Sequence, residues 1–278
     1  MARPLVAGVT AFVMLVIVVL LSMFGGIDQA IGADFQYQCD TALGPDPSST
    51  MTLTPASGSS PVSPSAALTV NRYAPPTGEP LDADATDRQR ACLSAMRSAP
   101  HQGAPLQTIE TGFAARCARE IIASLLNRAG GAGAPTRPLA PATMTAAVIR
   151  QASAAAGAGR CEPLESAGFD DASPPRLEVS ANVASGPLRC PNPTAGGTVI
   201  LPDGLAAQSL CGQLVAASAT SPGDLVFWGY QRNAPTRVAV AIDTTTVAGV
   251  DPVTGDMIRV PMPGGRDVHV KRVLGGAS

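Results

Sequence analysis

The chain has 278 residues, which is enough for one sizeable domain with appended segments. Charged residues make up only 14% of it and the formal net charge is -2, so the strongly basic character of a nucleic-acid-binding protein is excluded. Glycine (28 residues) and proline (26 residues) are abundant, but not at the level of a fully disordered chain, so we expect a folded part joined to a linker.

The N-terminus contains an apolar stretch, residues 5–24, that is free of charged side chains. A helix of about 20 residues, at about 1.5 Å per residue, spans the ~30 Å hydrocarbon core of a bilayer. Arg3 precedes the stretch, so we expect a cytoplasmic tip at residues 1–4, a single-pass anchor at 5–24 and all later residues outside the cell membrane. The alternative is a cleaved signal peptide ending near Ala30-Ile31-Gly32, which would leave the protein secreted.

Residues 25–87 are predicted to form a disordered extracytoplasmic linker. They are rich in Pro, Ser, Thr and Gly and contain few large apolar side chains. Such a segment cannot bury enough apolar surface to offset the entropy lost on ordering it. Within it, residues 68–73 form a short patch that we expect to dock on the folded part.

Residues 88–140 are predicted to form a helical extension of the main domain. A weak helical pattern covers residues 86–96, and a stronger one covers residues 106–128. In the stronger pattern, apolar side chains recur every four residues, at Ile109, Phe113, Cys117, Ile121 and Leu125. This spacing places them along one helical face, which we interpret as the face that packs on a core.

Residues 141–278 are predicted to form an α+β domain in which helices precede a small antiparallel sheet. Helices are expected over residues 143–156, after Pro141, and over residues 205–217, with a loop-rich segment between them. The expected strands follow in the order 225–228, 238–242, 244–250, 256–260 and 267–274. The first two strands should be joined by the polar loop 229–236.

The segment between Ser221 and Asp243 resembles a known family. Its turn Pro222-Gly223-Asp224 leads into Leu225-Val226-Phe227-Trp228. This run is similar to the P-G-D-L-V-F-[FW] pattern that opens the first strand of the sheet in the NlpC-type cell-wall cysteine peptidases, which are papain-like. The apolar run from Arg237 to Ile242 fits the next strand of that family. The resemblance implies a papain-like arrangement of helices on a small antiparallel sheet.

The catalytic residues of that family have no counterparts in this chain. The family base is a histidine at the start of the second strand, where this chain has Arg237, which stays protonated and cannot accept a proton. The family nucleophile lies in a D-C-S-G-[LY] motif that is absent here. Cys190 is the nearest cysteine by spacing, but Pro191-Asn192-Pro193 follows it and does not favour a helix N-terminus that activates a thiol.

The histidines and cysteines suggest structural roles. His101 lies in a polar loop and His269 on the outer face of an expected strand, so we expect both to be solvated. Since the two histidines show no spacing typical of metal ligands, no metal and no cofactor is expected. An even number of cysteines in an exported chain predicts up to three disulfides whose pairing the sequence does not fix. The candidate positions are Cys39, Cys92, Cys117, Cys161, Cys190 and Cys211.

These observations predict a membrane-anchored, extracytoplasmic protein of the bacterial cell envelope with a non-catalytic NlpC-like domain. By the resemblance, it is expected to bind peptidoglycan or a cell-wall or division protein, with Arg237 and Trp228 as ligand-binding residues. Arg237 either meets a peptide carboxylate or forms a structural ion pair. One alternative is an active cysteine peptidase of peptidoglycan that uses Cys190 with another base, such as His269. The other is a disulfide-stapled scaffold without a ligand cleft.

Overall fold

The computed structural model describes residues 32–46, 71–76, 84–129, 140–162, 164, 190 and 197–275. The predicted anchor at residues 5–24 lies outside this described part of the chain, as does most of the alternative cleavage site. Within the described ranges, no helix is both long and apolar enough to cross a membrane.

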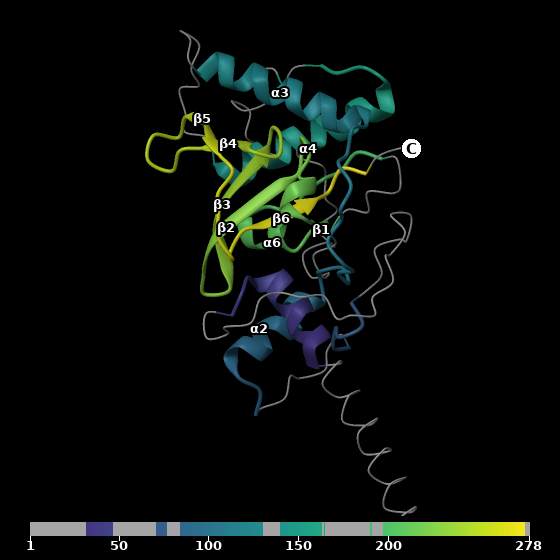
Figure 1. Ribbon diagram of the computed structural model, residues 1–278, viewed down its shortest axis with the longest axis vertical. Coiled ribbons are helices and arrows are strands. Elements are labelled where there is room, and N and C mark those ends of the chain that lie inside the picture. The colour runs from purple at the N-terminus through teal and green to yellow at the C-terminus, as the bar shows by residue number, and fades with distance from the viewer. Residues whose placement is uncertain are drawn as a thin grey trace, which may run out of the picture.

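A six-stranded antiparallel sheet forms the centre of the molecule (Figure 1). Its strands lie in the order β1-β6-β2-β3-β4-β5, and every neighbouring pair is antiparallel. The strands are β1 (Gln213–Val215), β2 (Leu225–Gln231), β3 (Ala234–Ala241), β4 (Thr246–Val250), β5 (Met257–Pro261) and β6 (His269–Arg272). The predicted α+β class and the five predicted strands are confirmed in outline, while β1 was not expected.

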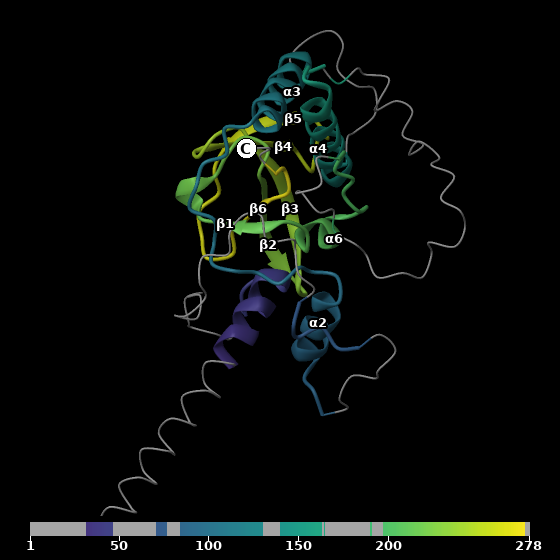
Figure 2. The same ribbon diagram turned by 90° about the vertical axis from the view of Figure 1, so that its right-hand side faces the viewer.

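Two long helices cover the sheet at the end opposite the N-terminal residues (Figures 1 and 2). They are α3 (Phe113–Ala129) and α4 (Pro141–Ala158), and α4 begins with proline at its first position, where the missing N–H costs nothing. Their apolar faces share one core with Leu225, Phe227 and Val240 of the central strands. Thus α3, from the predicted extension, and α4, from the predicted domain, bury their side chains together.

A second cluster of buried side chains lies on the opposite face of the sheet. It contains Val226 of β2, Ala239 of β3 and Val270 of β6, and the side chains of Leu106 and Trp228 pack against it. Burial on both faces explains why the strands read as continuous apolar runs, without the polar alternation of a strand that faces water on one side.

The β2–β3 hairpin is tighter than the predicted loop 229–236. The strands continue to Gln231 and from Ala234, so that only Arg232 and Asn233 form the turn. Both turn residues have positive φ, 50° and 65°, as in a type I′ turn, whose twist matches that of the flanking strands. The polar residues that suggested a loop therefore belong mostly to the strands.

The helix predicted over residues 106–128 begins only at Phe113. Leu106 instead forms a parallel bridge with Val215, so the chain runs extended along the β1 edge of the sheet before the helix starts. Ile109, which was assigned to the apolar stripe, lies in this extended part and is 56% exposed. The other four residues of the stripe are within α3, and the packing prediction is confirmed for them.

The helix predicted over residues 205–217 is also much shorter in the structure. The short helix α6 (Leu205–Ser209) ends before Cys211, and Gly212 follows with φ of 82°. Residues 213–215 then become β1, which pairs with β6. Pairing at the edge of a sheet therefore overrides the helical pattern of Leu210 to Ala217, and Gly212 provides the break.

Part of the predicted linker is folded. Residues 32–43 form a helix that packs beside α2 (Asp87–Met96), below the sheet in Figure 1, and Cys39 and Cys92 join the two helices. The linker prediction is thus wrong for these residues. Helix α2 has a capping box in which Thr86 and Gln89 bond each other's backbone, so the helix begins one residue after the predicted start at residue 86.

Residues 71–73, the described part of the patch 68–73, do pack on folded residues, but on the helix 32–43 of the segment that was predicted to be linker. The Asn71 amide donates to Gln38 Oε1 at 3.2 Å, and the ring of Tyr73 meets that of Phe35 edge to face, with centroids 5.4 Å apart. Arg72 forms an ion pair with Asp34 at 2.5 Å. We refer to residues 32–46, residues 71–76 and α2 together as the N-terminal clamp.

Gln102 connects the N-terminal clamp to the sheet. Its backbone N–H donates to Gln38 Oε1 at 2.8 Å, and its carbonyl accepts from Gln38 Nε2 at 2.7 Å. Its own side chain donates to the carbonyl of Gly212 at 2.9 Å and accepts from the backbone N–H of Leu214 at 2.8 Å. Because these groups are largely buried and each is bonded, the contact fixes where the clamp sits against β1.

Candidate functional site

All six cysteines form disulfides, so the prediction of structural disulfides is confirmed. The pairs are Cys39–Cys92, Cys117–Cys161 and Cys190–Cys211. The first holds the N-terminal clamp, and Cys117 of the second lies in the core formed by α3 and α4. Cys190, the alternative nucleophile, has its sulfur bonded to Cys211 and therefore carries no thiol.

Trp228 and Arg237 are direct partners across the β2–β3 hairpin. Trp228 is half-buried and packs on the second core, whereas Arg237 is exposed. No ion pair joins Arg237 to another residue of the described chain, so the structural ion pair expected as one of its two roles is not found there. The two side chains therefore place an aromatic ring and a cation on neighbouring strands.

The aspartate of the Pro-Gly-Asp turn is part of a buried polar cluster. Asp224 accepts from Nε and Nη2 of Arg272, both at 2.8 Å, and from the backbone N–H of Ser221 at 2.8 Å. Arg272 also donates to the carbonyls of Thr108 and Ala219, at 2.8 and 2.9 Å. The cluster ties the turn to β6 and to the segment that precedes α3, and all these bonds serve the fold.

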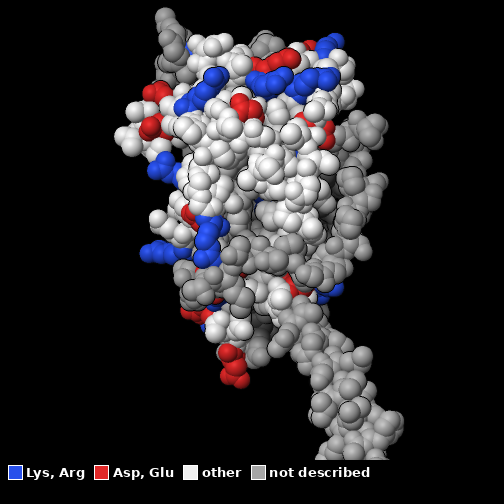
Figure 3. Space-filling model, viewed as in Figure 1, with Lys and Arg blue, Asp and Glu red and all other residues white. Residues whose placement is uncertain are grey.

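A cavity of about 550 Å³ lies where the N-terminal clamp meets the tip of the β2–β3 hairpin. Three parts of the chain line it. The clamp contributes Leu43, Pro45, Asp46 and Arg88, the hairpin contributes Tyr230, Arg232 and Asn233, and the loop before β6 contributes Arg266 and Asp267. Figure 3 shows basic side chains gathered at the level of the hairpin tip, separate from the charged group that lies along α3.

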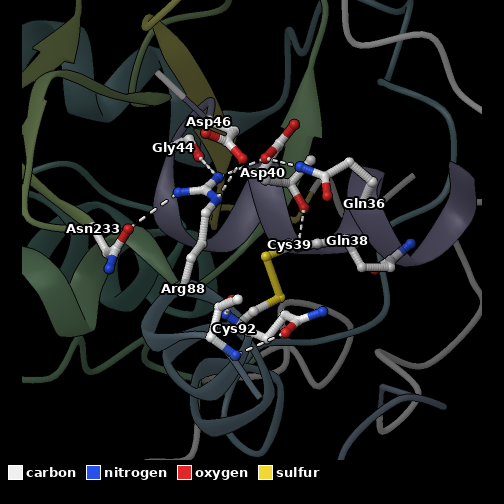
Figure 4. Close-up of a disulfide and its surroundings, with 12 residues drawn as sticks. Gln36, Gln38, Cys39, Asp40, Gly44, Asp46, Arg88, Cys92 and Asn233 are labelled. Atoms are coloured by element: carbon white, nitrogen blue, oxygen red, sulfur yellow. Dashed lines mark hydrogen bonds and ion pairs between the residues drawn. A yellow bond between two sulfur atoms is a disulfide. The ribbon is translucent and has the colours of Figure 1, made fainter. Parts of the chain in front are cut away.

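Arg88 joins the clamp to the hairpin at the wall of this cavity (Figure 4). Its Nη2 donates to Asp40 Oδ1 at 2.6 Å and to the carbonyl of Gly44 at 2.7 Å. Its Nη1 donates to Asn233 Oδ1 at 3.1 Å. Burial raises the pKa of Asp40 above its ordinary value, although the bond to Arg88 acts in the opposite direction. The Arg88 guanidinium is therefore held in one orientation by groups from both sides.

Tyr230 reaches from the hairpin into the space between the clamp and β6. Gly229 has φ of 67°, which interrupts the side-chain alternation of β2, and its N–H donates to Asp267 Oδ2 at 3.0 Å. As a result Tyr230 packs on the same core as Phe227, and its hydroxyl lies 3.2 Å from Nδ1 of His269. Burial raises the pKa of the Tyr230 phenol, which keeps it protonated.

The prediction of a solvated histidine is wrong for His269. His269 is only 2% exposed, and burial, helped by the nearby Lys271 charge, lowers its pKa to about 3. Lys271, the only lysine in the chain, is 1% exposed, and burial lowers its pKa to about 7. Their Cα partners on β2 are Leu225 and Phe227, so both side chains lie on the same face of the sheet as those two residues. His101 is half-buried, and burial lowers its pKa as well.

Sequence patterns did not reveal the cavity. Arg88, Arg232 and Arg266 are far apart in the chain and belong to no recognisable motif. Two signals were present nonetheless. One is the spacing of Phe35, Cys39 and Leu43, which is helical and lies inside the segment that was predicted to be disordered. The other is the Arg232-Asn233 pair between two apolar runs, which is compatible with a two-residue hairpin turn.

Comparison with known proteins gives no relative of this chain: no family model, no curated protein and no solved structure matches it. The site is therefore interpreted from its own geometry. Among the described residues, no three side chains of His, Cys, Asp or Glu are grouped so that they would hold a metal ion. The features available for function are a cavity rich in arginine and a tryptophan–arginine pair on the hairpin.

Proposed function

We propose that this chain is a non-catalytic binding module of the bacterial cell envelope. In this proposal the apolar stretch at residues 5–24 anchors it in the cell membrane and the folded part lies outside. The folded part is an NlpC-like domain that binds peptidoglycan or a protein of the cell wall. The resemblance around the Pro222-Gly223-Asp224 turn and the antiparallel sheet that follows it support this assignment of the domain.

The proposal that the domain is non-catalytic depends on the residues found at the positions of the family's nucleophile and base. A thiol peptidase needs a thiolate beside a base. Cys190 is bonded to Cys211, and the base position is occupied by Arg237, which keeps its proton. His269, the alternative base, is buried and lies within hydrogen-bonding distance of Tyr230. These facts favour binding over hydrolysis.

The cavity favours a binding module over a plain scaffold. A scaffold has no need of a cavity of about 550 Å³ lined by charged and aromatic side chains. Cavities of roughly 300–1,000 Å³ are typical of small-molecule sites. Three disulfides suit a protein that works outside the cytoplasm, where thiols are oxidised.

The test is sedimentation of the oxidised full-length protein, purified in detergent, with insoluble peptidoglycan. We expect saturable binding and no release of soluble fragments during prolonged incubation. A protein that stays in the supernatant at all peptidoglycan concentrations would contradict the proposal. Release of fragments that disappears with Cys190→Ala would establish the peptidase alternative instead.

A further inference from the structure

The cavity between the N-terminal clamp and the hairpin tip brings together three arginines from three separate parts of the chain. Arg88 comes from α2, Arg232 from the turn of the hairpin and Arg266 from the loop before β6. Among the described residues, the carboxylates that line the same cavity are Asp46 and Asp267. With Asp40 also bonded to Arg88, three carboxylates accompany the three arginines, so an anion site here depends on a cation that is not already paired.

Most of the charged groups in the cavity already hold the protein together. Arg88 is bonded to Asp40, Gly44 and Asn233. Asp46 lies 3.5 Å from Nε of Arg88, and Asp267 accepts from the backbone N–H of Gly229. The two carboxylates that line the cavity are thus occupied by interactions within the protein.

Arg232 differs from these groups. It is exposed at the rim of the cavity, and no hydrogen bond or ion pair joins its side chain to another residue among those described. It also occupies a turn position with φ of 50°, where residues other than Gly, Asn and Asp are uncommon. A solvent-facing guanidinium is thus presented on a rigid turn, at the rim of a cavity whose other charges are engaged.

We propose that this cavity binds the carboxylate of a short peptide, with Arg232 as its cation. A planar guanidinium pairs with a carboxylate through two parallel N–H donors, which makes arginine well suited to this ligand. The Tyr230 ring and the apolar side chains of Leu43 and Pro45 line the space that the adjoining peptide residue would fill. The proposal concerns the cavity itself and holds whether or not the chain binds peptidoglycan.

The test uses the oxidised full-length protein and two soluble probes, N-acetyl-Ala-Ala with a free carboxylate and its C-terminal amide. Ligand-observed NMR titration measures both dissociation constants. We expect a Kd on the order of 1 mM for the acid and binding at least about tenfold weaker for the amide. The Arg232→Gln variant should weaken binding of the acid about tenfold, because the main pairing group is lost.

The matched control is Arg259→Gln, which removes an exposed arginine of β5 that lies outside the cavity. It should leave the Kd of the acid within about twofold. Equal binding of acid and amide, absence of binding by the acid, or equal losses in the two variants would each overturn the proposal. Arg232→Asn, which suits the positive φ of the turn, is the second variant if Arg232→Gln does not fold. If the peptide probes do not bind but the protein still sediments with peptidoglycan, the cavity site is rejected and the proposed function stands.

Discussion

The Tyr230 ring lies directly against Gly44, at the place where the N-terminal clamp meets the sheet. A Cβ atom added to Gly44 would lie 2.3 Å from Cδ1 of Tyr230, well inside van der Waals contact. Gly44 also has φ of 89°, a conformation that L side chains rarely adopt. The absence of a side chain at residue 44 is therefore what lets the clamp approach the hairpin and close one wall of the cavity.

We predict that Gly44→Ala destabilises the folded protein by about 1–3 kcal/mol, because the new methyl group meets the ring and the backbone is strained. The effect should appear as a lower denaturation midpoint in urea. Gly264→Ala is the control, since a Cβ there would have no neighbour within 4 Å and its φ lies outside the left-handed range. Equal midpoints for the two variants would show that the Gly44–Tyr230 approach does not matter.

The buried ion pair between Asp224 and Arg272 predicts a large loss from removing one partner. Arg272→Met would leave the Asp224 carboxylate 2% exposed without its cation, together with the carbonyls of Thr108 and Ala219 that Arg272 now satisfies. We expect a loss of about 3–5 kcal/mol in the free energy of unfolding. Arg237→Met, on the exposed side of the hairpin, should change it by less than about 0.5 kcal/mol. Equilibrium unfolding in urea compares the two, and similar values would refute the structural role of the pair.

Because Lys271 is buried, we predict that the free energy of unfolding rises with pH. Its pKa is lowered to about 7 in the folded state, whereas the unfolded chain binds the proton up to about pH 10.4. Above pH 7 the folded state therefore holds fewer protons than the unfolded state, and raising the pH favours folding. The gain in unfolding free energy with pH therefore begins near pH 7 and grows through the alkaline range.

Lys271→Met should remove this slope and stabilise the protein near neutral pH, by on the order of 4 kcal/mol. The measurement is the difference in unfolding free energy between wild type and variant at several pH values from 7 to about 9.5, below the ordinary pKa of tyrosine. His269 faces the same core but titrates in a lower range, because its pKa is lowered to about 3. A difference that stays constant across the range would mean that Lys271 is solvated.

The Cys39–Cys92 disulfide closes the largest of the three intrachain loops, with a sequence separation of 53 residues. Replacing both cysteines by alanine should cost up to about 4 kcal/mol on the chain-entropy model. We expect the loss to be local, because this disulfide lies in the N-terminal clamp and not in the core under α3 and α4. Hydrogen exchange should then rise in residues 32–46 and in α2 while β2 and β3 stay protected. Uniform loss of protection would show that clamp and sheet unfold as one unit.

The central hairpin was predictable because its signals are local. The run from Leu225 to Trp228 and the run from Val238 to Ile242 are apolar on both faces, and each became a strand. The α3 stripe was predictable for the same reason. The failures come from contacts distant in sequence, such as the pairing of residues 213–215 with β6, which replaced an expected helix.

The candidate site was less accessible to sequence reasoning than the fold. The solvated role expected for His269 followed from the alternation of β6, but that face carries the core with Phe227, and Tyr230 packs against the imidazole, so the histidine is buried. Residues 32–43 were assigned to a linker because the composition of the longer segment concealed a helix of three turns. Without that helix, neither the Cys39–Cys92 pairing nor the cavity beside Arg88 could be anticipated.

The left-handed conformation of Arg232 sets stability against recognition at a single position. Asparagine is favoured over arginine at positive φ in a two-residue hairpin turn, so Arg232→Asn should tighten the turn and raise the melting temperature. The same change would take the exposed cation away from the rim of the cavity. A selection for thermal stability alone should therefore drift away from arginine at residue 232, whereas a selection for ligand capture should retain it.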